Sequence, residues 1–199
     1  MTFGLISLGC DKNRVDSEHI LALLTRAGYT YTDLQTAEVI VINTCAFIVS
    51  ARSEAIETVL SCAEQYPQAR LIVTGCLAQK YAHEIFDSLP EVAAFVGFRD
   101  YERLPNILAE IGDARRCAVD GCKMLEEEGR ILTTPPHYAY LKIADGCDNY
   151  CTYCTIPSIR GRFVSRPIEN IVAEAESLVR DGVRELILVA QRSEERRVG

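Results

Sequence analysis

Short apolar runs alternate with helical patterns along the first hundred residues, and this alternation restricts the possible fold more than any other feature of the sequence. The run Val39-Ile40-Val41-Ile42 is continuous, as in a strand that is covered on both faces. Such an alternation predicts an open α/β sheet with parallel strands. The predicted strands cover residues 3–7, 29–34, 39–43, 70–74 and 94–97, and the predicted helices cover residues 15–27, 51–65, 79–88 and 101–111.

A second α/β region follows a connection that is rich in acidic residues, glycine and proline. This connection, residues 113–136, holds Glu126-Glu127-Glu128 and the pair Pro135-Pro136, which indicate a domain boundary. One βαβ unit then follows, made of a strand at 138–144, a loop at 147–166, a helix at 168–180 and a strand at 184–190. We therefore expect a first domain at residues 1–112, a linker at 113–136 and the start of a second domain at 137–191.

Composition and charge exclude several classes of protein. The chain has 199 residues, of which 48% are hydrophobic, and this is enough to form a buried core. Its net charge of −7 argues against general binding to DNA or to an anionic membrane. Its apolar runs are far shorter than the roughly 20 residues that span a bilayer, and its start lacks the features of a signal peptide. We expect a soluble, cytoplasmic protein.

Nine cysteines are the chemically distinctive residues of this chain. Disulfides are rare in the cytoplasm, so these thiols are metal ligands, redox groups or small core residues. Cys147, Cys151 and Cys154 have the spacing C-x3-C-x2-C in a polar loop after a predicted strand. Three neighbouring thiolates can hold three corners of a 4Fe–4S cube, and the remaining iron can bind the amino and carboxylate groups of S-adenosylmethionine. Zinc and core packing are the alternatives, but a closed zinc site takes four ligands and the loop is rich in turn residues.

Three further cysteines, Cys10, Cys45 and Cys76, each lie just past the carboxyl end of a predicted strand. In a parallel sheet those ends share one edge, which is where such folds bind their ligands. The three thiols are therefore candidates for a second cluster. Packing explains them equally well, because cysteine is among the residues most often buried.

The remaining cysteines carry weaker predictions. Cys62 lies inside a predicted helix and is most simply a core residue. Cys117 and Cys122 lie in the predicted linker without further ligands nearby, so they stay unassigned. Tyr153 stands between two candidate ligands of the second domain, and we expect it beside whatever that cluster binds.

A local basic stripe follows the cysteine loop of the second domain. Arg160, Arg162 and Arg166 have no acidic residue between them. They can meet the carboxylate of a cofactor, an acidic substrate or a phosphate. A solvated surface stripe is the simpler explanation.

Several segments together resemble the radical S-adenosylmethionine methylthiotransferases, over residues 3–191. The resemblance is specific, because two separate cysteine triads match together with their flanking residues. Within the family, Ser7-Leu8-Gly9-Cys10 and residues 137–144 favour the members that modify a small-subunit ribosomal protein over those that modify tRNA. The matching segments are Ser7-Leu8-Gly9-Cys10-Asp11-Lys12-Asn13, Val15-Asp16-Ser17-Glu18, Asn43-Thr44-Cys45, Thr74-Gly75-Cys76-Leu77-Ala78-Gln79 and residues 137–154.

The resemblance implies an enzyme with two 4Fe–4S clusters. The radical-generating cluster would be bound by Cys147, Cys151 and Cys154, and an auxiliary cluster that supplies the inserted sulfur would be bound by the other triad. S-adenosylmethionine would serve both as methyl donor and as the source of a 5′-deoxyadenosyl radical, which takes a hydrogen from the β-carbon of an aspartate. A flavodoxin-type or ferredoxin-type protein would be the reductant. Both clusters would have to face one substrate pocket.

The resemblance ends at Gln191. A family member would continue through a partial (β/α) barrel and a small β-barrel domain, whereas residues 192–199 read Arg-Ser-Glu-Glu-Arg-Arg-Val-Gly. Back-translated, this octapeptide fits a common sequencing adapter, so our hypothesis is a non-native tail on an N-terminal fragment, which resequencing tests. We expect a fragment of this kind to have a stable first domain, a poorly supported second domain and little or no turnover.

Two other functions remain open at this point. A noncatalytic iron–sulfur protein that transfers electrons or senses redox state would use the same cysteines, but its cluster would be fully ligated. A tRNA methylthiotransferase would share both triads. The oligomeric state, the reductant and the form of the sulfur before transfer do not follow from the sequence.

Overall fold

The computed structural model describes residues 1–112, 114–121 and 129–191. The chain divides into two compact units, Met1–Ile131 and Leu132–Gly199, and the division falls inside the predicted linker. Among the described residues, no helix has both the length and the apolar character needed to cross a membrane.

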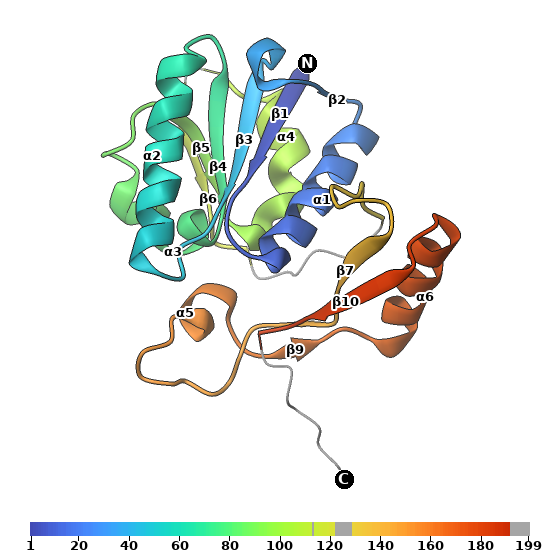
Figure 1. The fold of residues 1–199 in the computed structure, drawn as a ribbon. Helices are drawn as coiled ribbons and strands as arrows, with labels where there is room; N and C mark the ends of the chain where they lie inside the picture. Colours follow the sequence, from blue (N-terminus) through green and yellow to red (C-terminus); the bar gives the residue numbers. More distant parts are fainter. Residues whose placement is uncertain (113, 122–128, 192–199) are drawn as a thin grey trace. The chain divides into compact units, whose positions relative to one another are not determined.

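The first unit is built on a six-stranded sheet in which every pairing is parallel (Figure 1). Its strand order is β2-β1-β3-β4-β5-β6. Strand β2 therefore lies on one side of β1, and β3 to β6 follow in chain order on the other side. This is the predicted open α/β sheet, and the predicted fold class is confirmed. The strands are β1 (Thr2–Ser7), β2 (Thr30–Tyr31), β3 (Val39–Thr44), β4 (Arg70–Gly75), β5 (Val92–Val96) and β6 (Arg116–Ala118).

The core of this unit lies along the central strands. Every residue of β3 is buried, as its continuous apolar run predicts for a strand covered on both faces. Phe3 on β1, Ile72 on β4 and Phe95 on β5 are fully buried as well. Hydrophobic burial across these strands is the main stabilising term, and it fixes which strands are adjacent.

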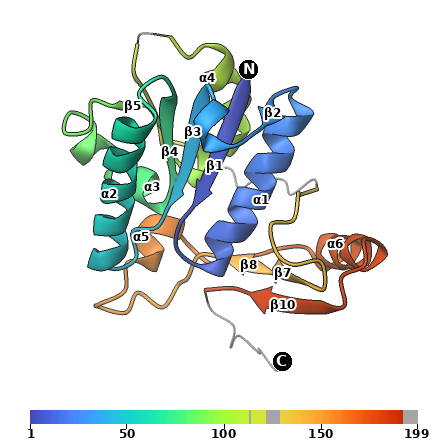
Figure 2. The same cartoon turned by 45° about the horizontal axis from the view of Figure 1, so that its top comes forward.

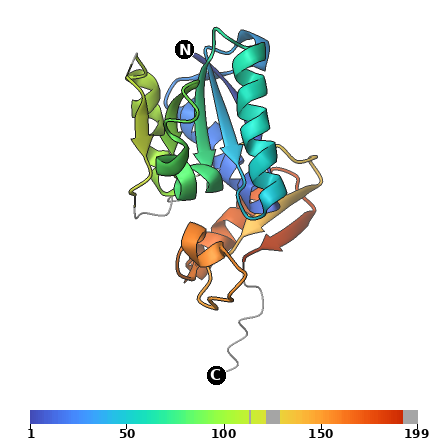
Figure 3. The ribbon, with the colours of Figure 1, turned by 90° about the vertical axis from the view of Figure 1, so that its left-hand side faces the viewer.

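Helices cover both faces of the sheet (Figures 1 and 3). Helix α1 packs against β1 and β3 and contacts α4, whereas α2 and α3 pack against β3 and β4. A hydrogen bond from Arg52 to the hydroxyl of Tyr81 joins α2 to α3. The helices are α1 (Asp11–Arg26), α2 (Val49–Gln65), α3 (Cys76–Ile85) and α4 (Leu104–Ala109), with short 3-10 helices at Leu34–Thr36 and Phe98–Arg103.

The first unit differs from the sequence prediction in several respects. The predicted strand at 29–34 is a strand only at Thr30–Tyr31, and the predicted helix at 101–111 is a 3-10 helix at Phe98–Arg103 followed by α4 at Leu104–Ala109. Helices α1 and α3 begin four and three residues earlier than predicted, at Asp11 and at Cys76. Residues 116–118, predicted as linker, form β6 and complete the sheet. The acidic run 126–128 and Cys122 lie outside the described residues.

The second unit contains one βαβ unit and a loop closed by a small ladder (Figure 2). Strands β7 and β10 pair in parallel, with α6 packed against β7. The predicted strand at 138–144 is divided into β7 and the start of β8, and the predicted loop at 147–166 holds helix α5 and strand β9, which pairs antiparallel with β8. The elements are β7 (Tyr138–Lys142), β8 (Ala144–Asp145), α5 (Ile156–Arg160), β9 (Val164–Ser165), α6 (Ile168–Arg180) and β10 (Glu185–Val189).

The hydrophobic core of the second unit is small. It consists of Ala139, Leu141, Leu178 and Val183, with partly buried side chains around them. Larger apolar side chains stay exposed on the same elements, notably Ile168 of α6 and Leu188 of β10, which are 69% and 61% exposed. This is the unpartnered apolar surface that we expect for two strands and one helix.

Candidate functional site

Three adjacent strands of the first unit end in one row, and each is followed by a cysteine. The register aligns Ser7 with Asn43 on β3, and aligns Asn43 with Thr74 on β4. Cys45 and Cys76 each lie two residues beyond this row. The carboxyl ends of these parallel strands therefore carry the predicted cysteine triad to one edge of the sheet, the lower end of the unit in Figure 1.

The backbone segments that carry these cysteines touch one another. A Cβ placed on Gly9, next to Cys10, would lie 2.5 Å from the Cβ of Cys45 and 3.1 Å from its Sγ. A Cβ placed on Gly75, next to Cys76, would lie 2.5 Å from the carbonyl oxygen of Thr44 and would overlap Asn43 Oδ1. The three cysteine segments are thus packed at a distance that only glycine permits.

Gly75 is also restricted by its backbone conformation. Its φ of 88° and ψ of −151° place it in a region that L-residues with a side chain essentially do not adopt. This turn lets α3 begin at Cys76, directly after β4 ends. Gly75 therefore sets the position of the third thiol.

Two of the thiols lie at the start of a helix. Cys10 is the N-cap of α1, and Cys76 is the first residue of α3. Within the described residues, the side chain of Cys10 makes no capping hydrogen bond to α1, and the N-cap of α3 is Gly75, which has no side chain to cap it. The helix dipoles favour negative charge at these ends, as a set of thiolates would carry.

The three thiols differ in their access to solvent. Cys45 and Cys76 are buried, with 8% and 7% of their surface exposed, whereas Cys10 is exposed. Two of the thiols are thus buried, and the third is exposed to solvent. Such a site can hold a soft metal centre on thiolates and still admit a reactant.

A buried polar network lies behind the cysteine triad. Asn43 Nδ2 donates to the backbone oxygen of Asn13 and to Ser17 Oγ, at 2.8 Å each. Ser17 Oγ in turn donates to Ser7 Oγ at 2.8 Å, and the hydroxyl of Tyr101 donates to Asn43 Oδ1 at 3.4 Å. No role is predicted for these residues from the sequence. The signal that identifies them is an asparagine at the end of a fully buried strand, because a buried amide needs partners.

The ligand role of this triad stays a prediction. In the described part of the chain, no three Cys, His, Asp or Glu side chains are placed to hold one metal ion. A 4Fe–4S cube holds each thiolate on a separate iron, so its ligands stand farther apart than those of a single ion. The donor set and its position at helix starts fit such a cluster.

In the second unit, the predicted C-x3-C-x2-C loop is closed at its base. Strands β8 and β9 pair Asp145 with Val164, and the amide of Cys147 donates to the carbonyl oxygen of Gly161 at 3.1 Å. Cys147 is buried, Cys154 is half-buried and Cys151 is exposed. The amide of Cys154 donates to the carbonyl of Cys151 at 2.9 Å, which forms a turn between two candidate ligands. The loop therefore has one anchored and two more accessible thiols.

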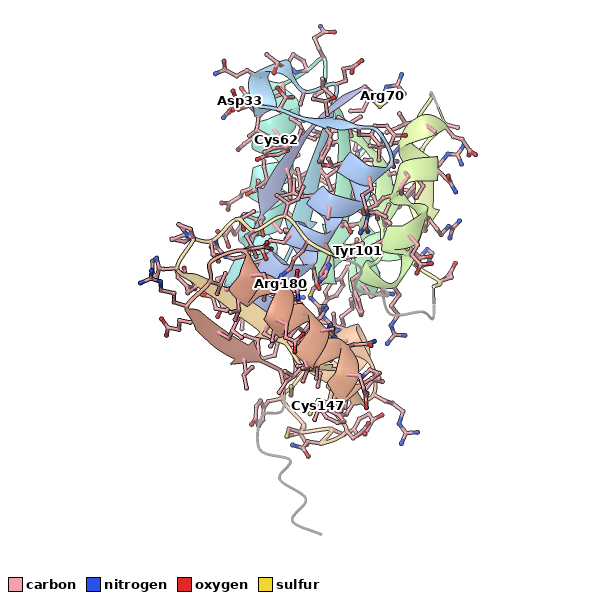
Figure 4. All side chains as sticks on the ribbon, turned by 90° about the vertical axis from the view of Figure 1, so that its right-hand side faces the viewer. Asp33, Cys62, Arg70, Tyr101, Cys147 and Arg180 are labelled. Atoms are coloured by element: carbon pink, nitrogen blue, oxygen red, sulfur yellow. The ribbon has the colours of Figure 1, made fainter. Side chains whose placement is uncertain are left out.

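A buried ion pair fastens the same loop. Arg160 NH1 lies 3.2 Å from Asp145 Oδ2, and both side chains are almost completely buried. A Cβ on Gly146 would overlap the carbonyl oxygen of Arg162, so the two ends of the loop are in direct contact. Cys147, labelled in Figure 4, follows directly after this anchor.

The arginines of the predicted basic stripe are engaged inside their own unit. Arg160 pairs with Asp145, Arg162 lies near Asp148, and Arg166 pairs with Glu174 at 2.6 Å. Each guanidinium lies close to a carboxylate that is 15, 14 or 8 residues away in the sequence, respectively. A solvated stripe was therefore the wrong prediction for Arg160 and Arg166, which are buried or nearly so.

Two tyrosines of the loop are exposed. Tyr153 is 86% exposed, so its predicted place beside a bound cofactor stays a prediction. Tyr150 is 62% exposed and has a φ of 46°, an unusual conformation for a residue with an aromatic side chain.

The remaining described cysteines lie elsewhere. Cys62 is buried in α2 (Figure 4), and burial raises the pKa of its thiol. Cys117 lies on β6, with its Sγ 4.0 Å from His83 Nδ1. Burial, and then the negative charges of Asp120 and Asp100, raise the pKa of Cys117. Both thiols are therefore poor nucleophiles at neutral pH, which suits a structural role.

Two protein families match separate parts of the chain, on either side of the boundary between the two units. Residues 2–97 match the model described as "Uncharacterized protein family UPF0004". Residues 141–193 match the Radical SAM superfamily.

Curated proteins with the name "Ribosomal protein uS12 methylthiotransferase RimO" are similar to this chain. The relative from Moorella thermoacetica is 49% identical over 190 residues, which is 94% of this chain and 44% of the relative. The relative from Clostridium kluyveri is 48% identical over 195 residues, with the same coverage. The relative from Clostridium tetani is 45% identical over 195 residues, 95% of this chain and 44% of the relative. The chain thus spans less than half the length of these relatives.

Proposed function

Because this chain combines a UPF0004 domain with a radical SAM segment and resembles the radical SAM methylthiotransferases, we propose that it adds a methylthio group to the uS12 protein of the small ribosomal subunit. The modified atom would be the β-carbon of an aspartate. The observation that carries the proposal is the row of three strand ends in the first unit that brings Cys10, Cys45 and Cys76 to one edge.

The first triad would hold the auxiliary cluster. Its thiols lie on three adjacent strand ends, and two of them stand at helix starts whose N–H groups favour an anionic ligand. The exposure of Cys10 leaves one side of the site open. Three thiolates on a four-iron cube leave one iron for the sulfur that is transferred.

The second triad would hold the radical-generating cluster. When bound, this cluster would supply the electron that cleaves S-adenosylmethionine. The residues of the chain keep its ligands in place, since the Asp145–Arg160 pair and the bond from Cys147 to Gly161 close the base of the loop. The exposed Tyr153 would form part of the surface that receives S-adenosylmethionine.

Partners and compartment follow from the same proposal. The substrate would be a ribosomal protein, and the reductant would be of the flavodoxin or ferredoxin type. The protein would work in the cytoplasm, without a membrane or DNA partner. The exposed apolar side chains of α6 and β10 indicate that the second unit needs additional chain to cover them, so we expect little turnover from these 199 residues alone.

Loss of the gene tests this function. Cells that lack it should contain uS12 without the methylthio mass increment, and a full-length copy should restore it. The measurement is mass spectrometry of the uS12 peptide, with digested tRNA nucleosides analysed from the same cells. An unchanged uS12 together with loss of a methylthiolated nucleoside would assign the chain to tRNA modification instead.

A further inference from the structure

We propose that Asn13 is the positioning residue that holds the three cysteine segments of the first unit together; this inference rests on the proposed cluster function of that triad. Asn13 lies in the first turn of α1, three residues after Cys10, and it is fully buried. Asn13 is the third residue of α1 and not its N-cap, which is Cys10, and its side chain bonds to residues outside the helix.

The amide nitrogen of Asn13 joins the first two segments. Its Nδ2 donates to the carbonyl oxygen of Leu8 at 3.1 Å and to that of Thr44 at 2.8 Å. Leu8 precedes Cys10 by two residues, and Thr44 directly precedes Cys45. Both N–H donors of one amide are therefore used to link the ends of β1 and β3.

The amide oxygen of Asn13 contacts the third segment. The Sγ of Cys76 lies 3.7 Å from Asn13 Oδ1 and, as a thiol, donates to it. A thiolate on a cluster would carry no such proton, so in the loaded state the two N–H bonds of Asn13 would hold the segments. One buried side chain thus touches all three cysteine-bearing segments, each at the carboxyl end of a different strand. The network behind it fixes its place, because Asn43 donates to the Asn13 backbone oxygen.

A control variant on the same helix separates the positioning role of Asn13 from its contribution to general stability. Ser17, one turn further along α1, is 1% exposed and belongs to the same network, through Ser7 and Asn43. In the described part of the chain, its side chain bonds to Ser7 and Asn43, and neither of these is next to a cysteine in the sequence. Alanine at Ser17 should therefore weaken the fold without releasing the thiols, which makes it the matched control.

The experiment uses the 199-residue chain with Cys147, Cys151 and Cys154 replaced by alanine, loaded anaerobically with iron and sulfide. Asn13→Ala should lose iron to a ferrous chelator at least about tenfold faster than the parent, since it removes both hydrogen bonds that join the segments of Cys10 and Cys45. Its electron paramagnetic resonance spectrum after reduction should also change. Ser17→Ala should match the parent in both measurements at a temperature where circular dichroism shows all variants folded.

Asn13→Asp provides a second variant if Asn13→Ala does not fold. It keeps the size of the side chain and replaces both N–H donors with an acceptor, so the same faster iron loss is expected. Iron loss and spectra equal to the parent in both Asn13 variants, or equal changes in Ser17→Ala, would overturn the inference. A parent that takes up no iron would instead contradict the proposed function, and this inference with it.

Discussion

Alanine at Gly75 should destabilise the first unit by several kcal/mol. The new Cβ would require a backbone conformation that costs about 1–3 kcal/mol for a residue with a side chain. It would also overlap Asn43 Oδ1 and press on the carbonyl of Thr44, and overpacking of this kind costs about another 1–3 kcal/mol. Urea unfolding of the metal-free chain, followed by far-ultraviolet circular dichroism, measures the sum.

Gly28 offers the matched control for this substitution. Its φ of 89° is nearly the same as that of Gly75, but a Cβ there meets no described atom within 4 Å. Gly28→Ala should therefore cost only the backbone term, about 1–2 kcal/mol. Equal losses of unfolding free energy in the two variants would show that the contacts of the new Cβ with Asn43 and Thr44 add no cost at Gly75.

Alanine at Arg160 should open the cysteine loop of the second unit. The substitution leaves Asp145 buried without its partner, which typically costs about 3–5 kcal/mol. The amide of Cys147, bonded to Gly161, reports on this loop in hydrogen exchange. We expect its protection to fall by about 100-fold or more.

Arg162→Ala is the control for that prediction. The Arg162 side chain is 82% exposed, and its contact with Asp148 is long, at 3.5 Å. Exposed pairs contribute about 0–1 kcal/mol, so the protection of Cys147 should hardly change. A small effect of Arg160→Ala, similar to that of Arg162→Ala, would mean that the buried pair does not anchor the loop.

The fold could be predicted from the sequence because its strands are strongly apolar. The run at Val39–Thr44 and the similar run at Arg70–Gly75 carry their own signal, and both are strands. The three residues of β6 carry none, since they pair with β5 only through tertiary context. The early starts of α1 and α3 were missed for a related reason, because cysteine is not a typical cap and the preceding glycine sets the turn.

The sequence predicts which residues are candidates for the site better than it predicts the contacts that hold them in place. Spacing made one cysteine triad a candidate ligand set, and strand position made the other a candidate, because strand ends in a parallel sheet meet at one edge. Hydrogen bonds between distant segments could not be derived in this way. The bond of Asn13 to Thr44 spans 31 residues, and the pair of Arg160 with Asp145 spans 15, so no local pattern indicates them.

Iron analysis of two triple variants tests the central claim most directly. The claim is that six thiols act as two groups of three, each holding one four-iron cluster. After anaerobic loading, the parent should contain about eight irons per chain, and alanine at either Cys10, Cys45 and Cys76 or at Cys147, Cys151 and Cys154 should leave about four. Full iron content in either triple variant, or loss of all iron in both, would contradict it.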